Sequence, residues 1–131
     1  MKIGFDYWQC ISHYPNEFRE LLGAFENFAD DVYVISAIGK GRIGTIANEI
    51  KQIKGWDNFN ENWYNERVIE VVFDSPKESP ELKLAKCKEL GIEMFFDDRD
   101  DVCRLLNANG IMALRVTRKD NSTYDLDAER K

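Results

Sequence analysis

The chain lacks the residue types that mark secreted, zinc-binding or membrane-spanning proteins. Its 131 residues include three cysteines, no CxxC pair and one histidine, so neither a disulfide framework nor a zinc site is expected. No apolar run approaches the roughly 18–20 residues that cross a bilayer. The short run at the N-terminus is broken by Asp6, which is unlike a signal peptide. We expect reduced thiols, a cytoplasmic protein and no membrane association.

Positive charge is also in short supply. The chain has 24 acidic and 18 basic residues, for a formal net charge of −6. Phosphate backbones require a basic surface, so general nucleic-acid binding is not expected. The hydrophobic fraction of 44% is typical of a globular protein. We expect one domain over residues 1–131, in which the polar tail 118–131 is a candidate for poor order.

Short apolar runs alternate with helix-like segments along the chain. Strands are predicted at 2–6, 32–36, 68–73, 93–97 and 111–117. Strands joined by helical crossovers pair in parallel and are covered on both faces. The predicted class is therefore α/β, with a central, mostly parallel five-stranded sheet flanked by helices in three layers.

Helices are predicted where apolar residues recur three or four positions apart. The first begins at Pro15, and its apolar face comprises Phe18, Leu21, Leu22, Phe25 and Phe28. The second ends at Gly55, and its apolar face comprises Ile43, Ile46, Ala47, Ile50 and Ile53. Two more are expected, one from Ser79 to Gly91 and one over 99–109.

One segment escapes this alternation. Residues 55–67 are rich in asparagine and aromatic side chains and are predicted as a loop. A loop of this length is either a lid or contact surface, or a connector folded onto the core by its aromatic rings. The sequence leaves both interpretations open.

Polar residues end three of the predicted strands. Asp6, Ser36 and the pair Asp97–Asp98 follow buried runs, and ligands bind outside the carboxyl ends of strands in open α/β sheets. Crowded carboxylates repel each other unless a cation intervenes, and oxygen ligands favour Mg²⁺. Acidic residues at 97–101 can instead favour the start of a helix, but that explanation does not cover Asp6.

The order of four motifs resembles the haloacid dehalogenase (HAD-like) superfamily over roughly residues 2–117. The motifs are IGFDYW, VYVIS, a lysine-bearing helix and MFFDDRDD. The resemblance implies a Rossmann-like fold and an Mg²⁺-dependent phosphohydrolase that acts through an aspartyl-phosphate. The run FFDDRDDV also resembles that of the deoxyribonucleotidases, which makes a nucleotide one candidate among phosphorylated small molecules.

The resemblance implies roles for residues that would hold the phosphoryl group. Ser36 would hydrogen-bond it, with Ala37 beside it in the substrate site. A lysine would neutralise the phosphate and the nucleophile, and Lys83 in KLAKCKELG matches best. Lys77 and Lys86 are rivals for that position.

The resemblance also implies a nucleophile and a metal site. Asp6 would attack phosphorus. The metal ligands would be Asp6, the backbone carbonyl of Trp8, Asp97 and Asp98, with Asp101 supporting the acidic pair.

Trp8 departs from the family pattern. Most phosphatases of the superfamily carry a second aspartate there, which protonates the leaving group and then activates water. An indole cannot titrate in this way, and losing a general acid or base costs roughly 10²–10⁴ in rate. His13, Glu17 and Cys10 are candidates to replace it, although His13 is more simply read as an exposed loop residue.

Two cations follow Ser36 in a glycine-rich link. Lys40 and Arg42 are candidates to contact a substrate phosphate or, as the favoured interpretation, to keep the link soluble.

Neither gap between the motifs is long enough for a separate cap domain, so a capless member is expected. The open crevice would suit bulky substrates or be covered by a second copy in a homo-oligomer. The favoured reading is an enzyme that hydrolyses a phosphoric monoester with an impaired or altered acid–base step. The alternatives are an inactive module that binds phosphate, nucleotide or a partner, and a purely structural protein.

Overall fold

The computed structural model describes residues 1–26 and 31–122. Five strands form one sheet in the order β3-β2-β1-β4-β5, and every pair of neighbours is parallel. The strands are β1 (Lys2–Phe5), β2 (Asp31–Gly39), β3 (Val68–Phe73), β4 (Ile92–Asp97) and β5 (Met112–Arg115). The predicted parallel five-stranded sheet is confirmed.

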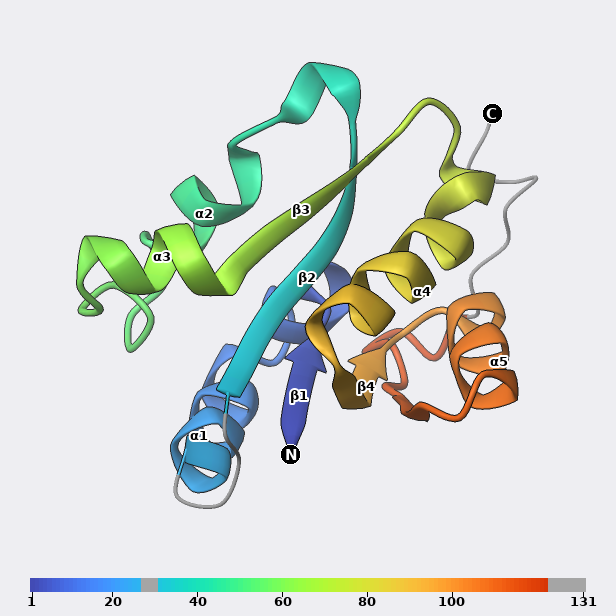
Figure 1. The fold of residues 1–131 in the computed structure, drawn as a ribbon. Helices are drawn as coiled ribbons and strands as arrows, with labels where there is room; N and C mark the ends of the chain where they lie inside the picture. Colours follow the sequence, from blue (N-terminus) through green and yellow to red (C-terminus); the bar gives the residue numbers. More distant parts are fainter. Residues whose placement is uncertain (27–30, 123–131) are drawn as a thin grey trace.

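Helices cover both faces of the sheet (Figure 1). One face carries α1 (Pro15–Glu26), α2 (Thr45–Ile50) and α3 (Glu61–Arg67), and the other carries α4 (Ser79–Leu90) and α5 (Asp100–Ala108). Each face has its own buried apolar cluster, so the molecule has the three layers that the sequence predicts. Among the described residues, every helix is too short or too polar to traverse a lipid bilayer.

The strand order reverses direction at β1. The chain adds β2 and β3 on one side of β1, and then returns to add β4 and β5 on the other. The connections that leave β1 and β4 therefore run to opposite sides of the sheet. Open α/β sheets form a binding crevice at such a point, at the carboxyl ends of the strands.

Gly4 on β1 lies close against an aromatic side chain of β4. Gly4 pairs with Phe95, and a Cβ atom at Gly4 would lie 2.6 Å from Cδ2 of that ring. A residue without a side chain is therefore required on β1 at this point.

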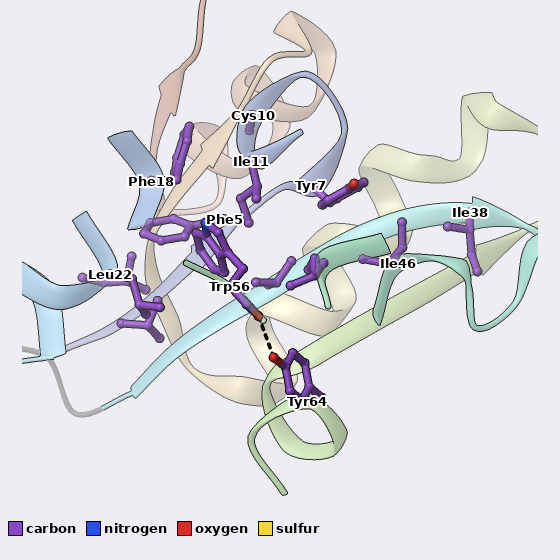
Figure 2. Close-up of a cluster of buried hydrophobic side chains, with 14 residues drawn as sticks. Phe5, Tyr7, Cys10, Ile11, Phe18, Leu22, Ile38, Ile46, Trp56 and Tyr64 are labelled. Atoms are coloured by element: carbon purple, nitrogen blue, oxygen red, sulfur yellow. Dashed lines mark hydrogen bonds between the residues drawn. The ribbon is translucent and has the colours of Figure 1, made fainter. Parts of the chain in front are cut away.

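The aromatic segment 55–67 belongs to the core. Trp56 is fully buried, and its indole Nε1 donates to the carbonyl oxygen of Pro15 at 2.9 Å. The hydroxyl of Tyr64 donates to the carbonyl oxygen of Trp56 at 2.5 Å, as Figure 2 shows. Residues 61–67 form α3 rather than a loop, because Asn60 caps the helix by accepting from the backbone N–H of Trp63. The segment is thus a connector folded onto the core.

The second predicted helix is shorter than expected. Ile43 is 66% exposed and precedes α2. Gly44 adopts φ +90° at the N-cap, so the helix begins at Thr45, after the first residue of the predicted apolar face. Ile53 packs against the core from the turns after α2. The first helix has its predicted apolar face up to Phe25, and Phe28 lies outside the described residues.

Candidate active site

Four elements deliver the polar residues of the crevice. Asp6 follows β1 directly, Ser36 lies in β2, Asp97 ends β4 and Lys83 lies in α4. In the parallel register Phe5 is opposite both Val34 and Phe96. Asp6 and Asp97 therefore emerge at the same edge of the sheet, and Ser36 comes two residues after Val34, within β2.

These side chains meet in a buried hydrogen-bonded group. Nζ of Lys83 lies 2.5 Å from Oδ2 of Asp97 and 3.1 Å from Oδ1 of Asp6. The Ser36 hydroxyl donates to the same Oδ1 of Asp6 at 3.1 Å. All four residues are at most 3% exposed. The sequence-predicted convergence of these residues is therefore present in the structure.

Among the three candidate lysines, Lys83 is the one that enters this group. Lys77 is exposed, and Lys86 forms an ion pair with Glu89 on the outer side of α4. The position of Lys83 follows from helix geometry, because it shares a face of α4 with the buried Cys87 and Ser79, four residues away on either side.

Asp97 and Asp98 differ in their surroundings. Both oxygens of Asp97 accept hydrogen bonds from the protein, Oδ2 from Lys83 and Oδ1 from the backbone N–H of Arg99 at 2.9 Å. Oδ2 of Asp98 accepts from Nε of Arg118 at 2.9 Å. The two aspartates therefore differ in role, since Asp97 binds Lys83 and Asp98 lines the pocket.

Burial and charge shift the ionisation of this group. Burial raises the pKa of Asp6 well above its ordinary value, and the negative charge of Asp97 adds to that, while Lys83 opposes both. Burial also raises the pKa of Asp97. Burial alone would lower the pKa of Lys83, but the charges of both aspartates and the hydrogen bonds to them outweigh it, so the net shift is upward. The two aspartates therefore favour the charged form of Lys83.

A group that can hold a metal ion lies beside the lysine. Carboxylate oxygens of Asp6 and Asp98 and the Sγ atom of Cys10 all lie within 4.8 Å of one another. Burial raises the pKa of the Cys10 thiol well above its ordinary value, and sulfur is a soft ligand that a hard cation does not prefer. Two carboxylates suit a hard cation such as Mg²⁺, which needs one or two of them and fills its remaining positions with water and substrate oxygens. The donor set therefore fits Mg²⁺.

A pocket of about 450 Å³ opens over these residues. The predicted site residues in its wall are Asp6, Trp8, Ala37, Lys83 and Asp98. Its size is that of a small-molecule site rather than of a phosphate ion alone. None of residues 55–67 lines it, so the structure does not support the interpretation of that segment as a lid.

Sequence reasoning missed several residues of the pocket wall, and three of them bear on its chemistry. Ser79, Arg99 and Arg118 all line it. Ser79 is fully buried, and its hydroxyl has no hydrogen-bond partner among the described residues. Arg118 lies just beyond β5, in the segment that the sequence predicts as a polar tail.

Arg99 links the pocket to Asp101. Its guanidinium donates to both carboxylate oxygens of Asp101, at 3.1 and 2.7 Å, and its backbone N–H donates to Asp97. Asp101 therefore reaches the acidic pair only through Arg99, and it also accepts from the backbone N–H of Val102 at the start of α5.

The other acid–base candidates lie apart from the pocket or beneath it. His13 is exposed, and its Nδ1 lies 2.9 Å from the hydroxyl of Ser12. Glu17 is exposed on α1. Neither residue lines the pocket, and Cys10 is fully buried next to Asp6 and Asp98.

The chain is similar to a bacterial phosphatase. It is 24% identical over 125 residues to the class B acid phosphatase of Salmonella arizonae, in an alignment that covers 90% of this chain and 50% of the relative. The chain thus spans about half the length of that curated relative. No family model and no solved structure matches it. Together with the α/β fold, this similarity supports a phosphatase-type hydrolase.

Proposed function

We propose that the protein hydrolyses phosphoric monoesters, with Asp6 as the nucleophile. The observation that carries the proposal is the buried contact of Lys83 with Asp6 in the wall of the pocket, where Ser36 also donates to the carboxylate. Both contacts use Oδ1 of Asp6, which leaves the other oxygen as the attacking atom. The haloacid dehalogenase resemblance and the similarity to an acid phosphatase support the same chemistry.

In the proposed first step, a carboxylate oxygen of Asp6 forms a bond to phosphorus, and the bond from phosphorus to the ester oxygen breaks. Lys83 and Ser36 then neutralise and hydrogen-bond the transferring phosphoryl group. The buried hydroxyl of Ser79, four residues before Lys83 on the same face of α4, is a further donor that a phosphoryl oxygen would satisfy. In the second step, water attacks the aspartyl-phosphate, releases inorganic phosphate and restores Asp6.

Asp6 and Asp98 would hold Mg²⁺, which when bound neutralises phosphate charge and orients the ester. Lys83, which Asp97 also holds, contacts Asp6 directly, so the chain supplies a fixed cation of its own beside the nucleophile.

Trp8 makes the acid–base step unusual. The residue two positions after Asp6 lines the pocket but offers no titratable group. The leaving oxygen would therefore take its proton from water, and substrates with good leaving groups, such as aryl phosphates, would be preferred over alkyl phosphates.

The second candidate is a module that binds a phosphorylated ligand without turning it over. The observation that favours it is the same indole of Trp8. Because the two candidates share the pocket and differ only in turnover, they can be separated by restoring the missing acid.

The test compares wild type, Asp6→Asn, Trp8→Asp and the double variant, with Mg²⁺ and 4-nitrophenyl phosphate. If the protein is an enzyme, wild type shows turnover that Asp6→Asn abolishes, and Trp8→Asp raises the rate by about 10²–10⁴. If wild type is silent and only Trp8→Asp gains turnover that depends on Asp6, the binding module is correct. Equal activity of Asp6→Asn and wild type would refute the proposed nucleophile.

A further inference from the structure

The cationic residues of the pocket wall differ in what balances their charge. Lys83 is paired with two aspartates, Arg99 with Asp101 and Arg118 with Asp98. Arg42 also lines the pocket. Within residues 1–26 and 31–122, it is the pocket cation with no carboxylate partner.

Arg42 is held in place by an aromatic ring. Its Cζ atom lies 4.9 Å from the centroid of the Trp8 ring, and that ring packs edge-on against Tyr7 with centroids 4.9 Å apart. A cation–π contact uses the face of the ring rather than an acceptor atom. The N–H donors of Arg42 therefore stay available for a ligand, while Trp8 limits where the guanidinium can go.

The wall of the pocket runs from the phosphoryl site to Arg42. Ala37, Ile38 and Gly39 follow Ser36 along β2 and all line the pocket, and Arg42 comes from the turn that follows. Asp6 and Arg42 thus lie in the wall of the same pocket, so a ligand whose phosphoryl group sits at Asp6 shares that pocket with the guanidinium.

We infer that Arg42 binds a second anionic group of the substrate. The inference rests on the proposed function and narrows it to phosphoric monoesters that carry a carboxylate or a second phosphate away from the ester. A guanidinium suits either group, because its planar donors match two oxygens at once. Trp8 then has a role in place of the missing acid, as the positioning residue for Arg42.

The experiment measures kcat/KM for phenyl phosphate and 2-naphthyl phosphate, each with and without a carboxylate on the ring atom farthest from the ester. The readout is the ratio of the carboxylated to the plain substrate. Comparing that ratio between variants cancels the effect of the carboxylate on the leaving group. The variants are Arg42→Gln and, as a matched control, Lys40→Gln. Lys40 lies in the same turn, is paired with Asp74 and does not line the pocket.

For the phenyl substrates, the naphthyl substrates or both, we expect wild type and Lys40→Gln to have the same ratio of carboxylated to plain substrate. That ratio should be about tenfold above the ratio of Arg42→Gln, which is the scale of one charge-assisted hydrogen bond. A ratio that Arg42→Gln leaves unchanged, or that Lys40→Gln lowers equally, would overturn the inference. If no substrate turns over, the proposed function fails. The second anion site can then be tested by calorimetry, which measures the ratio of the affinities for the carboxylated and plain phenylphosphonates and naphthylphosphonates. Loss of that affinity ratio in Arg42→Gln would uphold the second anion site, and its persistence would refute it.

Discussion

Nζ of Lys83 lies 2.5 Å from Oδ2 of Asp97, in a contact whose side chains are 2% and 0% exposed. A third charge, on Asp6, shares the same ammonium group at 3.1 Å. One cation therefore balances two carboxylates away from water. Lys83 is thus expected to contribute to the stability of the fold as well as to the proposed chemistry.

Replacing Lys83 by Met should destabilise the protein strongly. The change leaves Asp6 and Asp97 buried without their cation, and breaking a buried pair in this way costs about 3–5 kcal/mol. The loss should be smaller at pH 5 than at pH 8, because the buried carboxylates can then bind protons. Urea unfolding at both pH values measures it. Lys86→Met, which removes an exposed ion pair on the same helix, should change the free energy of unfolding by less than about 1 kcal/mol.

Ser79→Ala separates binding from stability. The hydroxyl is buried without a partner among the described residues, so its removal should leave the melting temperature unchanged or raised. If the hydroxyl serves the phosphoryl group, the affinity for inorganic phosphate should fall about five- to tenfold. Calorimetry and thermal unfolding test the two effects. A lowered melting temperature with unchanged affinity would show that the hydroxyl is structural.

Gly4→Ala should disturb the junction of β1 and β4. The new Cβ would lie 2.6 Å from the buried Phe95 ring, and overpacking of this kind costs about 1–3 kcal/mol. Chemical denaturation provides the measurement. Gly41→Ala is the control, since a Cβ there meets nothing within 4 Å. Similar stabilities for the two variants would contradict the close contact of Gly4 with the Phe95 ring.

Two buried thiols should make the protein sensitive to alkaline pH. Burial raises the pKa of Cys87 and of Cys103 to about 12, from an ordinary value near 9. A pKa raised in the folded state contributes stability that is complete below about pH 9 and is lost as the pH rises toward 12. The free energy of unfolding should therefore decline over this window, and Cys87→Ala should make the decline shallower. A slope that Cys87→Ala leaves unchanged would argue against the shifted thiol.

The sheet and the group around Asp6 were predictable because both depend on local patterns. Buried strands read as short apolar runs, and the carboxyl ends of parallel strands meet at one edge whatever lies between them. The helix α4 was marked by Ser79-Pro80 and Gly91, and the family resemblance favoured Lys83 among its lysines.

The remaining features depend on contacts that local patterns do not encode. The helix α3 was hidden in an asparagine-rich segment, although Asn60 is a favourable cap. Arg118 reaches Asp98 across the end of β5, and nothing in the surrounding polar sequence signals it. Arg42 was expected mainly to keep its link soluble. Its contact with Trp8 joins two segments that are far apart in the chain, so the local sequence does not reveal it.

The position of β1 in the middle of the sheet also constrains the order of folding. Its register partners lie at residues 31–34 on one side and at 92–96 on the other. A nascent chain that has emerged only as far as α4 has β1 with one edge unpaired, and it lacks the strand that supplies Asp97. The acidic crevice is therefore completed only after β4 has emerged, and until then the exposed edge of β1 is a site for pairing with other chains.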